Sequence, residues 1–183
     1  MLERCNAFIV ASSKQQTDAL TKLALRAGFV SVQSTGGVPL SARTMPNARI
    51  NFFLMHYQLT DEQKQAVLTA VRHNPDPNVH FSPVILIIND CPFEEILFYV
   101  QFGFDDIITL PEKAAVVNQR LSRQLAQPVL YVETPEYLGP DRRRMEMATG
   151  KEDTRRQGVA RHIRYTLERT PERGTQVLQK LMV

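Results

Sequence analysis

The fold follows from Asn51-Phe52-Phe53-Leu54-Met55-His56-Tyr57, a run of large apolar side chains that stops abruptly at a histidine and a tyrosine. A short apolar run bounded by polar residues is typical of a strand buried on both faces of a parallel sheet, although a piece of buried helix gives the same pattern. In open parallel sheets, ligands bind just past the carboxyl ends of such strands. His56, the first polar residue after the run, is therefore a candidate functional residue.

Further apolar runs alternate with helical patterns on both sides of this stretch. We predict the other strands at residues 8–11, 29–32, 84–88 and 107–111, and helices at residues 15–26, 40–45, 61–73, 94–102 and 112–126. Gly28 and Gly103 mark the ends of two of these helices. Strands that alternate with helices argue for an α/β fold, a doubly wound five-stranded parallel sheet.

The length of 183 residues suits one domain with an extension. No apolar run is long enough to cross a bilayer and the N-terminus lacks a signal sequence, so we expect a soluble cytoplasmic protein without membrane insertion. Cys5 and Cys91 have no companion cluster of metal ligands, and we interpret them as small buried apolar thiols. Neither a cofactor nor a metal is expected.

The positive charge is concentrated at one end of the chain. Residues 127–183 carry eleven Lys or Arg side chains against eight Asp or Glu, which accounts for the whole net charge of +3. Nine of the eleven cations are arginines, whose planar guanidinium suits phosphate and carboxylate groups. The extension is therefore a candidate for binding an anionic partner, and a solvated, partly disordered tail is the alternative.

A specific motif then identifies a family resemblance. The segment Phe102-Gly103-Phe104-Asp105-Asp106-Ile107-Ile108-Thr109-Leu110-Pro111 resembles the Ala-Gly-Ala-Asp-Asp-Tyr-Leu-x-Lys-Pro signature of CheY-like receiver domains of response regulators. Residues 83–86 are similar to the fourth strand of that family, and residues 51–59 to its third strand and the following turn. The resemblance implies a flavodoxin/CheY-like fold. We therefore predict a degenerate receiver domain at residues 1–126 and an arginine-rich C-terminal extension at residues 127–183.

The resemblance also implies a chemistry that this sequence does not retain. An active receiver accepts a phosphoryl group from a histidine kinase onto an aspartate, with Mg²⁺ held by an acidic pair. At the matching positions the chain has His56 for the nucleophile, Ser12 and Ser13 for the acidic pair, Ile88 for the hydroxyl, Leu110 for the lysine and Ile107 for the aromatic residue. We therefore predict a pseudo-receiver with a degenerate phosphoacceptor pocket and no enzymatic activity.

His56 has two further interpretations, as a phosphorylated histidine or as a metal ligand. Phosphotransfer histidines of this signalling class lie on helix faces, and no second ligand type clusters near His56 in the sequence. Asp90 and the pair Asp105-Asp106 could approach the same edge of the sheet. We favour a structural or partner-facing role for His56, and we expect the Asp-Asp pair to shape the loop before the fifth strand.

The extension contains Tyr137-Leu138-Gly139-Pro140-Asp141-Arg142-Arg143-Arg144, which resembles a segment found after receiver-like domains in some bacterial proteins. We expect a turn at residues 139–141 that presents the arginines and leaves Tyr137 free to pack. Residues 127–132 are expected to lie against the domain or to pair with another chain. Apolar residues at four-residue spacing predict short helices, one with Val159, Ile163 and Leu167 and one with Val177, Leu178, Leu181 and Met182.

These features favour a non-catalytic adaptor in bacterial two-component or chemotaxis signalling. Its fourth and fifth helices would engage a protein partner, with the extension as a second contact or a homodimer arm. The alternative function is binding of cyclic di-GMP, as in a group of CheY-like effectors, where Arg142, Arg143 and Arg144 beside Tyr137 would supply phosphate contacts and stacking. Nucleic-acid binding is not expected, because the acidic residues of the extension dilute its positive field.

Overall fold

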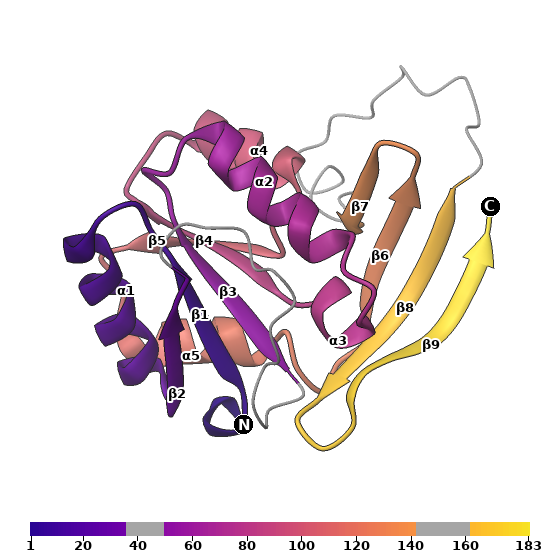
Figure 1. The fold of residues 1–183 in the computed structure, drawn as a ribbon, viewed down its shortest axis with the longest axis horizontal. Coiled ribbons are helices and arrows are strands. Elements are labelled where there is room, and N and C mark those ends of the chain that lie inside the picture. The colour runs from indigo at the N-terminus through magenta and orange to yellow at the C-terminus, as the bar shows by residue number, and fades with distance from the viewer. Residues whose placement is uncertain (36–49, 142–161) are drawn as a thin grey trace.

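The computed structural model describes residues 1–35, 50–141 and 162–183. Among these residues the chain forms a five-stranded sheet in the order β2-β1-β3-β4-β5 and a four-stranded sheet in the order β7-β6-β8-β9. The two sheets occupy opposite sides of the molecule in Figure 1, and the short helix α3 lies between them.

The first part of the chain alternates strands with helices. After a 3-10 turn η1 (Leu2–Arg4), its elements are β1 (Asn6–Val10), α1 (Lys14–Ala27), β2 (Ser31–Ser34), β3 (Asn51–His56), α2 (Asp61–Arg72), α3 (Pro77–His80), β4 (Val84–Asn89), α4 (Phe93–Phe102), β5 (Asp106–Leu110) and α5 (Ala114–Ser122). All four strand pairings are parallel. The strand order is that of flavodoxin and CheY, so the predicted fold class is confirmed for this sheet.

Helices cover both faces of the parallel sheet. Phe52 and Leu54 of β3 pack in a core with α1 and α5. Phe53 and Met55 point the other way and pack in a second core with α2, α3 and α4. Successive side chains of a strand point to opposite faces, so a strand with both faces covered is apolar without interruption. This explains the run that begins at Asn51.

Polar caps set where the helices begin and end. Ser13 and Thr60 each form a capping box with the glutamine three residues later, Gln16 and Gln63 respectively. At the other end of α1, Gly28 adopts a left-handed conformation with φ of 107° that side chains other than glycine rarely tolerate. The end of α1 predicted from Gly28 and the start of α2 predicted at residue 61 are therefore confirmed.

The predicted position of the second strand and the predicted burial of Cys91 were wrong. We expected a strand at residues 29–32, but β2 is displaced toward the C-terminus and Phe29 packs edge-on against Phe52 with ring centroids 5.3 Å apart. Cys5 is buried as expected, whereas Cys91 is partly exposed. The predicted helix at residues 40–45 lies outside the described residues.

The C-terminal extension forms strands where helices were predicted. Its elements are β6 (Val129–Thr134), β7 (Tyr137–Pro140), β8 (Ile163–Thr170) and β9 (Gly174–Met182), all paired antiparallel. The residues 139–141 expected to form a turn lie in and directly after β7, and the hairpin instead turns at Pro135 and Glu136. The helix predictions at 163–167 and 177–182 were therefore wrong, and residue 159 lies outside the described residues.

Among the described residues, no helix is both long enough and apolar enough to span a bilayer.

Candidate functional site

The predicted phosphoacceptor positions lie at one edge of the parallel sheet. The strand register pairs Val10 with Met55 and His56 with Ile87, and it pairs Asn89 with Leu110, so the carboxyl ends of β1, β3, β4 and β5 lie side by side. The residues in question are Ser12 and Ser13 after β1, His56 at the end of β3, Ile88 in β4 and Leu110 at the end of β5.

The two serines start α1 rather than offering a site for a cation. Ser13 Oγ accepts a hydrogen bond from the backbone N–H of Gln16 at 3.3 Å. The Gln16 side-chain oxygen in turn accepts from the Ser12 hydroxyl at 2.9 Å and from the Ser13 backbone N–H at 3.2 Å. Both hydroxyls are thus used in capping, and the group at the centre of the arrangement is a neutral amide.

A neutral hydrogen-bonded chain connects this helix start to His56. Gln16 Nε2 donates to Gln58 Oε1 at 2.5 Å, and the Gln58 backbone N–H donates to His56 Nδ1 at 3.3 Å. Because Nδ1 accepts, the ring carries its proton on Nε2 in the neutral form. Burial lowers the pKa of His56, which favours this neutral form. His56 is therefore an uncharged member of a polar network.

The remaining two positions are apolar. Ile88 is 1% exposed and packs in the core with α2 and α4, while Leu110 is partly buried against the core on the other face. Beside them, Asn89 Nδ2 donates to the hydroxyl of Tyr57 at 2.9 Å. A lysine or a hydroxyl that could contact phosphate is thus absent from the positions of Ile88 and Leu110.

The residues at this edge do not fit the Mg²⁺ ion that the family resemblance implies. Mg²⁺ requires oxygen ligands, with at least one carboxylate in most protein sites. Asp90 follows β4 at this edge, but its side chain is exposed, and none of Ser12, Ser13 and His56 supplies a second carboxylate. No group of three or more His, Cys, Asp or Glu side chains within the described ranges could hold a metal ion.

The opposite edge of the sheet holds a buried charged cluster that the sequence analysis did not predict. The Asp105 side chain is 1% exposed and precedes β5. Its carboxylate accepts from Arg72 Nη2 at 2.7 Å, from Arg169 Nη2 at 3.1 Å, from the Val84 backbone N–H at 2.8 Å and from the Tyr131 hydroxyl. Asp105 therefore connects β4 and α2 to β6 and β8 of the second sheet.

Arg169 is the residue through which β8 enters this cluster. Its side chain is fully buried, and it donates to the carbonyl of Phe81 at 2.9 Å, to Gln124 Oε1 at 3.1 Å and to the Tyr131 hydroxyl at 2.6 Å. Two guanidinium carbons, of Arg72 and Arg169, each lie 5.3 Å from the centre of the Tyr131 ring. We name Arg72, Asp105, Tyr131 and Arg169 the junction cluster.

The expectation that Asp105 and Asp106 shape the loop before β5 was confirmed. Both shape the loop before β5, because Asp105 accepts from Val84 N–H and Asp106 accepts from Ile107 N–H at 2.8 Å. They lie at the amino end of β5, however, so they do not share an edge with His56. The signal missed in the sequence was alternation, since Tyr165, Leu167 and Arg169 point to one face of a strand.

The candidate anion-binding residues are only partly described. Tyr137 is engaged within its own strand, where its hydroxyl donates to the carbonyl of Pro140 at 2.9 Å. Its ring lies over Gly139, because a Cβ at Gly139 would stand 2.5 Å from the Tyr137 hydroxyl oxygen. Tyr137 is thus not free to pack elsewhere, and Arg142, Arg143 and Arg144 lie outside the described residues.

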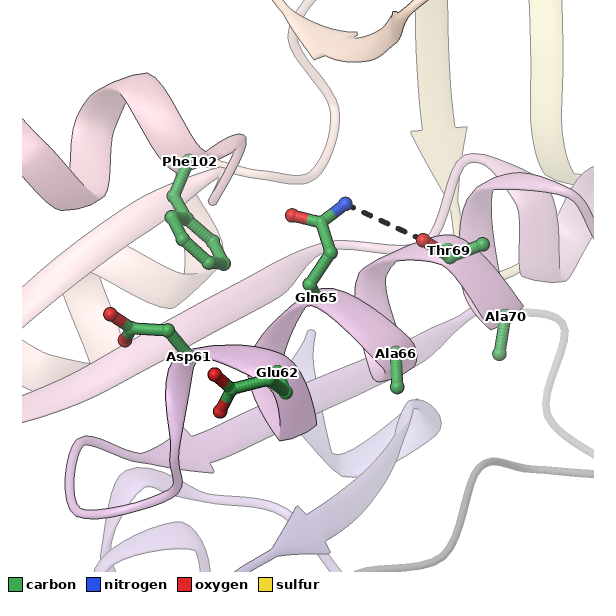
Figure 2. Close-up of a pocket in the computed structure, with 7 residues that line it drawn as sticks. All are labelled: Asp61, Glu62, Gln65, Ala66, Thr69, Ala70 and Phe102. Carbon is green, nitrogen blue, oxygen red and sulfur yellow. Dashed lines mark hydrogen bonds between the residues drawn. The ribbon is translucent and has the colours of Figure 1, made fainter.

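A hollow on the α2 side of the molecule is the other candidate site, with a volume of about 750 Å³. Figure 2 shows its lining, which consists of Asp61, Glu62, Gln65, Ala66, Thr69, Ala70 and Phe102. A second hollow of about 490 Å³ continues from it toward the β6–β7 hairpin and shares Gln65, Thr69 and Phe102. The first hollow is shallow and open to solvent, so the two form a shallow groove along α2 that is acidic at the Asp61 end. We call it the α2 groove.

Solved structures of receiver domains resemble this chain at low sequence identity. No protein-family model matches the chain, and no curated protein sequence matches it significantly. The signal receiver domain of a signal transduction histidine kinase from Syntrophus aciditrophicus is similar in structure, with 20% identity and a TM-score of 0.48 over 64% of this chain and 87% of that one.

Two further solved structures, both of response regulators, are similar to this chain at low sequence identity. One is a response regulator in red light signaling of R. palustris, with 15% identity and a TM-score of 0.45 over 64% of this chain and 89% of that chain. The other is a response regulator receiver domain from Rhodospirillum rubrum, with 17% identity and a TM-score of 0.43 over 63% and 89%. At this level of similarity, the fold assignment depends on the strand order and helix placement of the chain itself.

Proposed function

We propose that this chain is a non-catalytic signalling protein of the two-component type, a pseudo-receiver that acts through protein–protein contacts. Residues 1–126 are the proposed pseudo-receiver and residues 127–183 its extension, in which Tyr131 of β6 and Arg169 of β8 contact Asp105 at the amino end of the parallel sheet. The observation that carries the proposal is the neutral network at the carboxyl edge, where Ser12 and Ser13 cap α1 and His56 accepts from Gln58. Phosphoryl transfer at this place requires an anionic nucleophile and a bound dication, which these residues do not provide.

The proposed partner surface combines α4 with the α2 groove. Phe93 and Phe98 of α4 are 58% and 47% exposed, and Phe98 contacts Phe102 at the edge of the groove with ring centroids 5.7 Å apart. Exposed aromatic side chains grouped in this way are typical of interaction sites. Acidic residues border the patch, namely Asp61, Glu62, Glu94 and Glu95. The matching partner is a protein with an apolar centre and a basic rim.

Phosphorylation provides the first test. Incubation with a small phosphodonor and Mg²⁺ should leave the intact mass of the protein unchanged, and a phosphoryl adduct would overturn the proposal. The matched variant is Ser12→Asp/Ser13→Asp/His56→Asp, which returns three carboxylates to the edge. This variant should gain measurable Mg²⁺ affinity in calorimetric titration, whereas the unmodified chain should show none.

Genetic complementation distinguishes a role of the partner surface from a role of the phosphoacceptor pocket. In a deletion strain of the source organism, His56→Gln should restore the signalling phenotype because the pocket is not used for transfer. Phe98→Glu should fail to restore it, because it places a charge in the centre of the partner surface. Leu25→Glu, on the exposed face of α1, is the matched control and should behave like the unmodified chain. Failure of His56→Gln, with Phe98→Glu active, would contradict the proposal.

Binding of cyclic di-GMP, the alternative function, is tested directly by calorimetry. Under the adaptor proposal, calorimetric titration with cyclic di-GMP shows no saturable heat. Saturable binding that disappears in Arg142→Ala/Arg143→Ala would instead favour the effector function, because arginines bind phosphates in bidentate geometry and stack on guanine.

A further inference from the structure

The edge strand β9 is the most exposed apolar element of the described chain. It pairs with β8 on one side and lies at the end of its sheet on the other. Its exposed apolar residues, continuing to the end of the sequence, are Val177, Leu178, Leu181, Met182 and Val183, with Met182 at 75% exposure. An edge strand of this kind is a template for pairing with another strand unless charge, proline or a covering segment blocks it.

The backbone of β9 presents unpaired groups outward over part of its length. Val183 and His162 exchange both backbone hydrogen bonds, at 2.9 and 3.0 Å. Backbone groups alternate sides along an antiparallel strand, so Lys180 and Met182 direct theirs away from β8. Within the described ranges, no hydrogen bond reaches these outward groups. Near the start of the strand the edge is closed, because Thr175 N–H donates to Asn78 Oδ1 at 3.0 Å.

The other edge of the same sheet is closed to pairing. Strand β7 is 4 residues long and ends at Pro140, which has no N–H to donate. The Tyr137 ring also lies over Gly139, as described above. Only β9 among the described strands of this sheet therefore offers a long edge for another chain.

We propose that β9 pairs antiparallel with β9 of a second copy of this chain, joining the two four-stranded sheets across a two-fold axis. In the register that we infer, Leu181 lies opposite Leu181 of the other copy, and Lys180 lies opposite Met182. The neighbouring register would place Lys180 opposite Lys180, and like charges directly opposite are destabilising. Residues that face each other in the inferred register also lie on the same face of the sheet.

The pattern of charge favours a second copy as the occupant. Lys180 is the only charged residue from Gly174 to Val183, so the edge offers little for an oppositely charged partner to recognise. Self-pairing instead brings apolar and neutral side chains together around the axis. Because the β7 edge is closed, the assembly stops at two copies, which is the commonest closed symmetry of soluble oligomers. This inference is independent of the proposed signalling function.

Sedimentation velocity over a wide range of protein concentration tests the assembly. The unmodified chain should shift from monomer to dimer as concentration rises. Leu181→Lys should stay monomeric, because it places two ammonium groups across the axis. The matched control Leu25→Lys replaces an equally exposed leucine, 51% against 45% exposed, and should still dimerise. A chain that is monomeric at every concentration, or a dimer that Leu181→Lys leaves intact, would overturn the proposal.

Crosslinking tests the register. Leu181 uses its backbone groups toward β8, so its pair across the axis is of the non-hydrogen-bonded kind, with Cβ atoms about 5 Å apart. Leu181→Cys in a Cys91→Ser background should give a covalent dimer with oxidised glutathione, while Leu25→Cys in that background should not. Cys5 does not interfere, since burial raises the pKa of its thiol to about 12. Equal crosslinking of the Leu181→Cys and Leu25→Cys variants would contradict the inferred register.

Discussion

The two ends of the parallel sheet differ in charge and in burial. At the carboxyl end, where open α/β folds bind their ligands, Ser12, Ser13 and His56 join a neutral network near the surface. At the amino end, Asp105 lies between Arg72 and Arg169 with almost no exposure. The difference teaches that this chain uses buried charge to attach a second sheet, whereas the polar groups at its carboxyl edge are satisfied by neutral hydrogen bonds.

The energetic consequences of the two arrangements also differ. A buried carboxylate is tolerated only when paired and hydrogen-bonded, and Asp105 meets this requirement with its several donors. Loss of one member leaves the others buried and uncompensated. Around His56 the partially exposed groups can return to water, so loss of one hydrogen bond costs much less. Substitutions at the two ends should therefore differ clearly in effect.

The largest effect is expected for Asp105→Ala. It leaves two buried guanidinium groups without their carboxylate, which should lower the free energy of unfolding by about 3–5 kcal/mol. Denaturant unfolding measures this value. Asp90→Ala, an exposed aspartate at the carboxyl end, is the control and should change stability by less than about 0.5 kcal/mol. If Asp105→Ala and Asp90→Ala unfold at the same denaturant concentration, the proposed difference in stability between the two ends of the parallel sheet is wrong.

An intermediate effect is expected for Ser13→Ala. Its hydroxyl caps α1, and loss of such a cap typically costs about 1 kcal/mol. Thr60→Ala removes the equivalent cap of α2, so the two variants should lose similar stability in thermal unfolding. A much larger loss for Ser13→Ala would show that the serine does more at the carboxyl edge than begin a helix.

The smallest effect is expected for His56→Asn, as a change in pH dependence. Burial lowers the pKa of His56, so the unfolded chain binds a proton at higher pH than the folded chain does. The free energy of unfolding should therefore fall as pH drops below about 6.5, the usual histidine value. Denaturant unfolding across this range should show a shallower fall for His56→Asn. Some dependence should remain, because burial also lowers the pKa of His80.

The parallel sheet could be predicted because its signals are local. The apolar run at residues 52–55 and the β-branched run at residues 84–88 are typical of strands covered on both faces, and both runs are buried. Gly28 and Thr60 mark helix ends through backbone conformation and capping, which depend on a few neighbouring residues. His56 followed from the same strands, whereas Ser12, Ser13, Ile88 and Leu110 were assigned from the resemblance to receiver domains.

The second sheet could not be predicted from spacing alone. Ile163 and Leu167 are four residues apart, and residues at that spacing share a face in a helix and in a strand alike. The intervening Tyr165 decides between them, since it lies on the same face and packs with Leu167. The partners of Asp105 were equally hidden, because Arg169 is 64 residues away in the sequence and comes near only through the docking of β8.

The junction cluster has a consequence for the order in which the protein folds during synthesis. The ribosome delivers the last strand of the parallel sheet at Leu110, but Arg169 emerges only after β6 and β7 have been made. Until then, Arg72, the Val84 backbone N–H and Tyr131 are the protein groups that can reach the Asp105 carboxylate, and water takes the place of Arg169. Contacts so distant in sequence form slowly, because a long loop must close before they stabilise anything. We therefore expect the parallel sheet to form before β8 brings Arg169 to Asp105 and completes the junction cluster.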